Sequence, residues 1–274
     1  MMNLTQTAAD SVNRAAWSRL ETVTEFDALE GWCDAGERVA LAHVADEVRD
    51  QPILDIGVGG GRTTAFLRLL SADYTAIDYT PEMVSLTRRK YPELTVLQAD
   101  ARDLSMFETG QFQLVFFSFN GIDAVDHAGR QQILREVRRV LRPGGIFLFS
   151  THNANGPACG EKPWKLGRLD AYSRLGAARY SIRRSVDLPR SVVNYRTMAK
   201  LSTDGDGYCM RPAAAHRFTI AIHYTTLHRQ LRDLADAGFA PGFDVFDKTR
   251  GAAVDPGGDT RSVWWFYIVA RTPA

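Results

Sequence analysis

The chain has 274 residues and a formal net charge of +1. This length suits one large domain or a domain with an insertion, and the near-neutral charge gives no global sign of a polyanionic partner. Its composition, 45% hydrophobic and 24% charged, is that of an ordinary globular protein. No apolar run is long enough for a bilayer, and no signal peptide is apparent at the amino terminus. We therefore expect a cytoplasmic protein without a membrane span.

Residues 1–50 are predicted to form a helical cap. The segment is acidic, with ten Asp or Glu residues against four Arg. Apolar residues recur at helical spacing through Val39, Leu41, Val44 and Val48. Two interpretations remain open: these helices either cover a cofactor cleft or present a solvated face.

Residues 51–152 alternate between predicted strands and helices, which indicates a mostly parallel sheet with helices on both faces. Ligands of such sheets bind beyond the carboxyl ends of the strands. The predicted strands are 52–57, 73–78, 94–98, 112–119 and 146–151, and the predicted helices are 61–70, 81–90 and 127–141.

A glycine-rich turn follows the first of these strands, with the pattern D-x-G-x-G-x-G at Asp55, Gly57, Gly59 and Gly61. A dinucleotide fingerprint would place its third glycine where this chain has Arg62. Asp55 would also repel a pyrophosphate, whereas it suits a ligand that presents an ammonium group. The turn therefore disfavours an NAD(P)-dependent oxidoreductase.

Three further motifs follow in order. Tyr74–Asp78 is a short strand that ends in a carboxylate, Leu97–Ala101 ends with Asp100 and Ala101, and Leu141–Gly145 leads into a buried strand. With these motifs, residues 50–152 resemble the class I S-adenosylmethionine-dependent methyltransferases. The resemblance implies a doubly wound α/β fold with a seven-stranded, mostly parallel sheet, whose last, antiparallel strand would be 263–270.

The resemblance also implies a set of residues that bind S-adenosylmethionine. Asp78 would hold the ribose, Tyr79 and Met83 would line the adenine, and Asp100 and Ala101 would lie at the adenine edge. The full predicted cofactor set is Asp55, Gly57, Gly59, Gly61, Asp78, Tyr79, Met83, Asp100, Ala101 and, at the end of the fourth strand, Ser118.

Residues 153–215 break the alternation and are predicted to form a basic insertion over the acceptor site, after which 216–274 return to the core. Strands within 183–200 are expected to pair across the turn at 204–207, and 216–224 alternate as a half-buried strand. Residues 161–200 contain ten Lys or Arg and three acidic residues. This charge fits an anionic acceptor bound by residues such as Arg183, a solvated surface, or an RNA partner.

Methyl transfer from a sulfonium is an in-line displacement, which needs a general base only if the acceptor atom carries a proton. His152 directly follows the fifth strand and is the best-placed base, ahead of His216 and His223, although a structural role remains open. Position alone suggests acceptor contacts at Asn120, Asp123, Asn153, Tyr224 and Arg183. The three scattered cysteines form no metal-binding pattern, so no metal is predicted.

The sequence thus predicts an enzyme that moves a methyl group from S-adenosylmethionine to an O, N or S atom of a small metabolite, one with a carboxylate or other anion. An RNA methyltransferase that uses the basic insertion is the first alternative; nucleic acid is less favoured because few aromatic residues interleave the basic ones. An NAD(P)-dependent oxidoreductase and a non-catalytic S-adenosylmethionine-binding protein are the others. The sequence does not set the oligomeric state.

Overall fold

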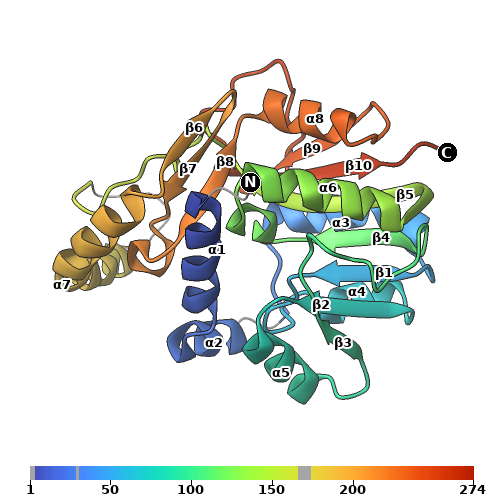
Figure 1. The fold of residues 1–274 in the computed structure, drawn as a ribbon, viewed down its shortest axis with the longest axis horizontal. Coiled ribbons are helices and arrows are strands. Elements are labelled where there is room, and N and C mark those ends of the chain that lie inside the picture. The colour runs from blue at the N-terminus through green and yellow to red at the C-terminus, as the bar shows by residue number, and fades with distance from the viewer. Residues whose placement is uncertain (1–3, 29–30, 166–173) are drawn as a thin grey trace.

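The computed structural model describes residues 4–28, 31–165 and 174–274, and for residues 4–8, 20 and 174–185 it describes the backbone alone. Its main feature is a seven-stranded sheet with the order β3-β2-β1-β4-β5-β10-β9 (Figure 1). Only β10 runs antiparallel to its neighbours, so the predicted seven-stranded sheet with an antiparallel last strand is confirmed. The strands are β1 (Ile53–Ile56), β2 (Tyr74–Asp78), β3 (Thr95–Gln98), β4 (Phe112–Phe117), β5 (Leu141–His152), β9 (Asp244–Asp247) and β10 (Trp265–Arg271).

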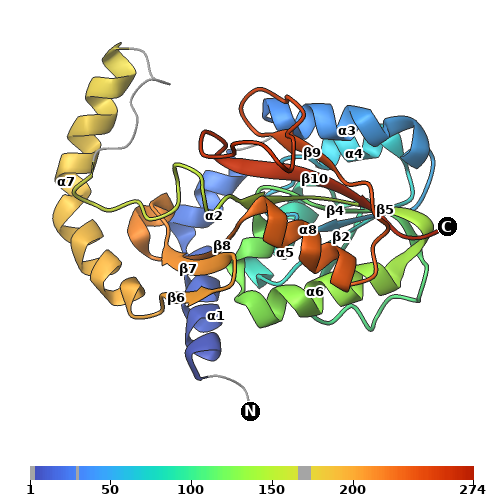
Figure 2. The same ribbon diagram turned by 90° about the horizontal axis from the view of Figure 1, so that it is seen from above.

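Helices cover both faces of this sheet. On one face lie α3 (Ala35–Val48), α4 (Thr64–Leu70) and α5 (Pro81–Lys90), and on the other lie α6 (His127–Val140) and α8 (Leu227–Asp236). Figure 2 shows α3 and α4 on the side of the sheet opposite to α6. None of the helices that the structure describes combines the length and the apolarity needed to cross a bilayer.

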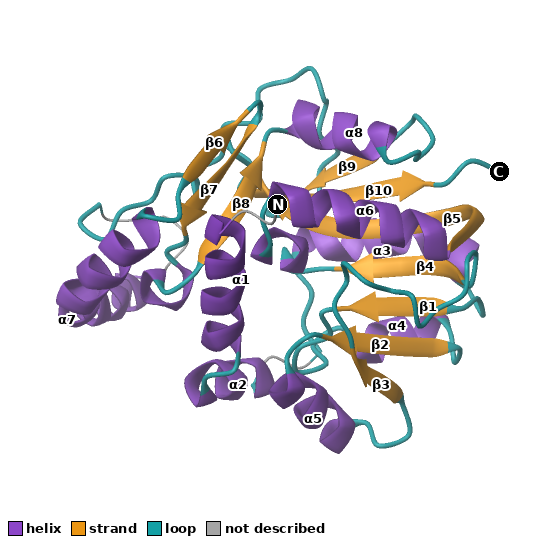
Figure 3. Cartoon of the chain, viewed as in Figure 1, coloured by secondary structure: helices purple, strands orange, loops and turns teal. Residues whose placement is uncertain are grey.

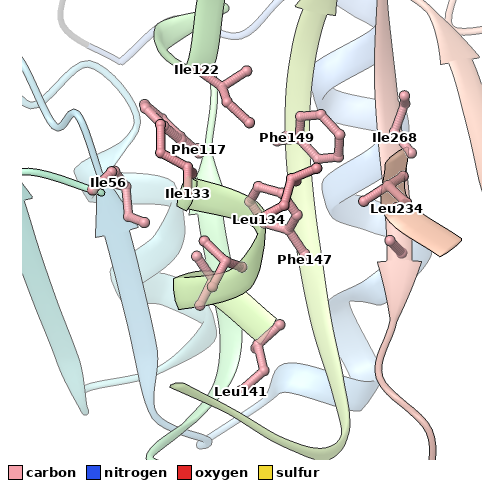
Figure 4. Packing of buried hydrophobic residues seen from close by; sticks show 14 of the residues in the cluster. Ile56, Phe117, Ile122, Ile133, Leu134, Leu141, Phe147, Phe149, Leu234 and Ile268 are labelled. Atoms are coloured by element: carbon pink, nitrogen blue, oxygen red, sulfur yellow. The ribbon is translucent and has the colours of Figure 1, made fainter. Parts of the chain in front are cut away.

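The α6 face carries the larger apolar core, drawn in Figure 4. Ile133 and Leu134 of α6 pack there against Phe117, Phe147 and Phe149 of the central strands. Because β4 is covered on both faces, nearly all of its residues are buried, as its apolar sequence predicts. This core fixes the carboxyl ends of β4 and β5, and a short 3-10 helix, η1 (Gly121–Ala124), follows β4.

In the amino-terminal segment predicted to be helical, α1 (Leu4–Trp17) and α2 (Leu20–Asp27) lie beside the carboxyl ends of the strands (Figure 1). The apolar residues that predicted a helix, Val39, Leu41, Val44 and Val48, belong instead to α3, on a face of the sheet. The Asn13 amide anchors α1 at two distant positions. It donates to the main-chain oxygens of Ala124 at 2.7 Å and Ala221 at 2.8 Å, and its oxygen accepts from the Ala221 N–H at 3.1 Å. Since Asn13 is only 1% exposed, α1 is joined to the core through a buried polar contact.

The prediction of strands within 183–200 is wrong, because this stretch belongs to a long helix, α7 (Arg174–Ala199). The segment has no glycine after Gly176, and residues such as Ala, Arg and Met favour a helix even with Pro189 inside it. The predicted turn does occur, between β6 (Thr203–Gly205) and β7 (Tyr208–Pro212).

The strand predicted over 216–224 begins only at Ala221. Residues Ala215–Phe218 form a 3-10 helix, η2, in which His216, Arg217 and Phe218 have positive φ values. The remaining strand, β8 (Ala221–Thr225), is fully buried instead of half-buried and pairs with β7 in a separate sheet of order β6-β7-β8. Figure 3 shows this small sheet beside the main one. Because β6 and β7 precede residue 215 and β8 follows it, the small sheet spans the boundary predicted between the insertion and the returning core.

Candidate cofactor and acceptor site

The glycine-rich turn leaves β1 at the predicted place, at the carboxyl edge of the sheet. Gly57, Gly59 and Gly61 have φ values of +68°, +55° and +79°, which residues with a Cβ rarely adopt. The N–H groups of Gly57 and Val58 both donate to the main-chain oxygen of Ile77, at 2.8 and 3.1 Å. The turn after β1 is thereby fixed against the end of β2.

Asp78 joins the turn to the second motif. One of its carboxylate oxygens accepts from the Gly59 N–H at 3.0 Å, and the other accepts from the Thr80 N–H at 2.8 Å. The side chain is 6% exposed, and burial raises the pKa of its carboxyl. Each oxygen has a further lone pair, so the group is still able to accept hydrogen bonds from a ligand.

Asp55 lies deeper than its predicted role suggests. It is 2% exposed, and its carboxylate accepts from the Tyr74 hydroxyl at 2.6 Å. Burial raises the pKa of Asp55 to about 7, although the bond from Tyr74 lowers it. Its contact with the ammonium group of a ligand stays a prediction.

The residues predicted around adenine lie together beneath α1. The Arg14 guanidinium is 4.7 Å from the centre of the Tyr79 ring and 3.7 Å from Asp100. Burial alone would raise the pKa of the Asp100 carboxyl, but hydrogen bonds from Arg102 bring it below its usual value. Met83 and Ala101 are buried. The Tyr79 hydroxyl is also buried and finds no hydrogen-bond partner in the part of the chain that the structure describes.

The helix α2 closes on the glycine turn itself. A Cβ atom placed on Gly59 would be 2.9 Å from the Phe26 ring. The Lys90 ammonium donates to the main-chain oxygens of Asp27 at 2.8 Å and of Gly60 at 3.1 Å, and so ties the end of α2 to the turn. Of the two interpretations of the amino-terminal segment, these contacts favour the one in which its helices cover the cofactor side.

A buried ion pair stands beside the turn and was missed from the sequence. The Arg62 guanidinium donates to both carboxylate oxygens of Glu37, at 2.6 and 2.7 Å, with side-chain exposures of 8% and 0%. The Ser118 hydroxyl donates to the same carboxylate, so this predicted cofactor residue already has a partner. Arg62 also lies over the rings of Phe119 at 4.7 Å and Trp32 at 5.4 Å. The residue that excluded a dinucleotide fingerprint therefore has a structural role.

On the acceptor side, His152 and Asp123 form a pair. His152 Nδ1 lies 2.7 Å from Asp123 Oδ2, and the main-chain N–H of His152 donates to the same oxygen, also at 2.7 Å. Asp123 is fully buried in η1, whereas the His152 side chain is 17% exposed. The His152 ring lies 5.3 Å from that of Tyr224 and 5.7 Å from that of Trp265, measured between centroids. This geometry directs Nδ1 inward and leaves Nε2 as the free ring nitrogen.

The other residues predicted to contact the acceptor differ in their burial and in their hydrogen-bond partners. Asn120 follows β4 in a left-handed conformation, and its side-chain oxygen is buried without a partner among the described residues. Asn153 is fully buried and donates to the main-chain oxygens of Thr260 and Val263, so its amide anchors a loop. Tyr224 is 1% exposed. The side chain of Arg183 lies outside the described residues.

The other two candidate bases have different surroundings. His223 is fully buried, and its ring lies 5.5 Å from that of His127 and 5.2 Å from that of Tyr208, two rings that stack on each other at 3.9 Å. His216 packs edge-on against Trp17. Burial lowers the pKa of both imidazoles. Neither is paired with a buried carboxylate as His152 is.

Comparisons with known proteins identify what the chain is similar to in sequence and in fold. Residues 53–145 match the family model described as a methyltransferase domain. An uncharacterized methyltransferase of Synechocystis is 35% identical over 99 residues, which cover 36% of this chain and 46% of that protein. A ubiquinone biosynthesis O-methyltransferase of Xanthomonas oryzae is 36% identical over 107 residues, 37% of this chain and 43% of that protein. The chain therefore spans less than half the length of these curated relatives.

Solved structures share the fold over most of the chain. One is the 1,6-didemethyltoxoflavin-N1-methyltransferase of Burkholderia thailandensis, solved with S-adenosylhomocysteine, with a TM-score of 0.59, 16% identity, and coverage of 98% of this chain and 91% of that one. An S-adenosylmethionine-dependent methyltransferase of Mesorhizobium loti has a TM-score of 0.58 at 20% identity, over 86% and 97% of the two chains. Residues 53–145 are thus similar to a methyltransferase domain, and the chain shares the fold of solved S-adenosylmethionine-dependent methyltransferases.

Proposed function

We propose that this protein is an enzyme that transfers a methyl group from S-adenosylmethionine to a small-molecule acceptor at the carboxyl edge of the sheet. The observation that carries the proposal is the joint position of the glycine turn, Asp78 and His152 at that edge. The relatives support it, because their printed names include O- and N-methyltransferases of small molecules.

The residues present fit the cofactor. The glycine turn and Asp55 would hold its amino acid end, and the Asp78 carboxylate would accept hydrogen bonds from its ribose. Tyr79, whose buried hydroxyl lacks a partner among the residues described, would lie with Met83 against the adenine, with Asp100 and Ala101 at its edge. When bound, the cofactor supplies an electrophilic methyl group on a sulfonium. The enclosing contacts of α1 and α2 support the exclusion of water from it.

His152 is proposed as the general base. Asp123 accepts from Nδ1, and this contact favours the tautomer in which Nε2 carries a free lone pair. A base of this kind is useful only where the acceptor atom carries a proton before transfer, as in a hydroxyl or an N–H group. The pair therefore favours O- or N-methylation over methylation of a thioether. Because both oxygens of Asp123 are engaged inside the protein, we assign it to the support of His152 and not to acceptor binding.

We further propose that the acceptor carries a carboxylate or similar anion. Support comes from a cavity of about 260 Å³ between α2, α7 and η2, whose charged lining consists of three arginines, Arg19, Arg190 and Arg217, and three acidic residues, Glu21, Glu25 and Asp187. Arg217 is paired with Asp187 and Glu21, so Arg19 and Arg190 are the cations we expect to bind the anion. No described contact favours the RNA alternative over this one.

Methyl transfer from radiolabelled S-adenosylmethionine to a panel of phenols, N-heterocycles and thioethers tests the proposal. We expect transfer to hydroxyl or N–H acceptors, and a loss of about 10²- to 10⁴-fold in kcat for His152→Ala. His43→Ala is the matched control, because His43 is a half-exposed histidine paired with Asp244 away from this edge. Transfer only to thioethers, or full activity of His152→Ala, would contradict the assignment of His152.

A further inference from the structure

Arg130, on α6, is a fully buried arginine that the sequence did not single out. Its side chain is 1% exposed, and among the side chains that the structure describes it is the largest fully buried one. One guanidinium nitrogen donates to Asp123 Oδ1. The other donates to the Gln230 side-chain oxygen and to the Thr151 hydroxyl, the latter at 3.2 Å. The Arg130 guanidinium and the His152 ring thus contact different oxygens of the same Asp123 carboxylate.

The Asp123 carboxylate is surrounded by donors on all sides. Oδ1 accepts from Arg130 and, at 2.8 Å, from the Thr151 hydroxyl. Oδ2 accepts from the main-chain N–H of His152 and pairs with its Nδ1, both at 2.7 Å. With no exposed surface, this carboxylate can carry its charge only if a cation compensates it inside the protein.

We propose that Arg130 is a positioning residue that supplies this compensating charge, so that His152 can bond to Asp123 as a neutral imidazole and act as a base. This inference rests on the proposed function of His152. Among the described residues, Arg130 and His152 are the two basic groups that pair with Asp123. If Arg130 is removed, an imidazolium at His152 becomes the available counter-ion, and an imidazolium cannot accept a proton.

The other groups near this cluster do not substitute for Arg130. On β8, His223 is fully buried and burial lowers its pKa, as does the charge of Arg130 itself, so it stays neutral. Asp233 on α8 is an anion that interacts with Arg130 and is paired with Arg229. Around the His152 ring, Tyr224 has its pKa raised by burial and remains a neutral phenol, and Trp265 does not ionise in this range. The Lys248 ammonium lies 3.8 Å from the centre of the Trp265 ring, whose face it contacts.

The test compares Arg130→Met with the wild-type protein by the pH dependence of kcat and by an NMR titration of the His152 ring. For Arg130→Met we expect the acid limb of kcat and the midpoint of the ring titration to move to higher pH, by about one to three pH units, because the carboxylate loses its other cation. Arg130→Lys, which keeps a charge, should return both toward the wild-type values. The affinity for S-adenosylhomocysteine should change less than about threefold.

Arg138→Met is the matched control, because Arg138 is on the same helix but only partly buried, with a bond to the main-chain oxygen of Gly238. It should leave both profiles unchanged. If Arg130→Met is too unstable to titrate, the comparison of Arg130→Lys with Arg138→Met tests the proposal instead. A lysine cannot reproduce the contacts of both guanidinium nitrogens, so Arg130→Lys should still shift the midpoint upward by a fraction of a pH unit. Unchanged midpoints in folded Arg130 variants, with loss of stability alone, would overturn the proposal. The ring titration needs no acceptor, so it separates this failure from a failure of the methyltransferase assignment.

Discussion

Phe26 closes on Gly60 so tightly that a Cβ atom on Gly60 would overlap the main-chain oxygen of Phe26. The helix that ends near Phe26 is therefore seated directly on the glycine turn, 34 residues along the chain from it. Gly60 is not among the residues with positive φ, so its backbone conformation does not require glycine. Glycine is needed there because a side chain would prevent the close approach of Phe26. The amino-terminal cap and the proposed cofactor site are thus one structural unit.

Gly60→Ala should displace α2 from the turn. The atoms that the new methyl group meets belong to the backbone of Phe26 and cannot rotate away, and overpacking of this kind costs about 1–3 kcal/mol. We expect faster proteolysis within residues 4–28 and weaker binding of S-adenosylhomocysteine. Gly257→Ala is the control, since its Cβ would make only an ordinary contact of 3.6 Å. Equal proteolysis rates for the two variants would show that the cap does not depend on this contact.

The buried pair of Glu37 and Arg62 should be sensitive to the loss of either partner. Glu37→Gln leaves the guanidinium buried without a counter-charge, which should lower the free energy of unfolding by about 3–5 kcal/mol. The double variant Glu37→Met with Arg62→Met should lose less than the single one, because no charge is then stranded. Chemical denaturation measures both. Arg261→Ala, which breaks the exposed pair with Asp259, should have no measurable effect. A Glu37→Gln protein as stable as wild type would be inconsistent with this account.

The raised pKa of Asp55, about 7, predicts two effects of pH. The folded state holds a proton on Asp55 that the unfolded state releases above pH 4, so this contribution to stability is full in acid and is lost as the pH rises through 7. Between pH 5 and 8, stability should therefore decline more steeply in wild type than in Asp55→Asn.

The affinity for S-adenosylhomocysteine should change in the opposite direction. An ammonium group binds the ionised carboxylate, so affinity should increase by up to about tenfold from pH 6 to pH 8 as Asp55 loses its proton. Calorimetric titrations at both pH values measure it, and Asp55→Asn should show no such increase. The same pH dependence in both proteins would remove Asp55 from the proposed cofactor contacts.

The parts of the fold that the sequence predicts are those with a local signal. Alternating strands and helices, the positive-φ glycines and the carboxylate at the end of β2 are each encoded within a few residues, and the topology follows from their order. The helix α7 was missed because residues 174–199 have neither strand alternation nor a clear amphipathic pattern, so composition had to decide.

The support of the site could not be predicted in the same way. Glu37 and Arg62 are 25 residues apart, and Asp123 and His152 are 29 apart, on elements that only the packed sheet brings together. The local sequence around a charged residue does not show whether a partner of opposite charge lies buried beside it. Position at a strand end identified His152 and Asp123 as candidates, but the bond between them, and Arg130 behind it, depend on tertiary structure.

Calorimetric titration of S-adenosylhomocysteine into the wild-type protein and Asp78→Ala tests the central claim most directly. The account predicts binding to wild type and an affinity lower by about tenfold or more for Asp78→Ala, since hydrogen bonds to a charged carboxylate contribute about 1.5–3 kcal/mol. Asp73→Ala, an exposed aspartate just before the same strand, should bind as wild type does. Undiminished affinity in a folded Asp78→Ala protein, or binding of NADH in place of S-adenosylhomocysteine, would contradict it.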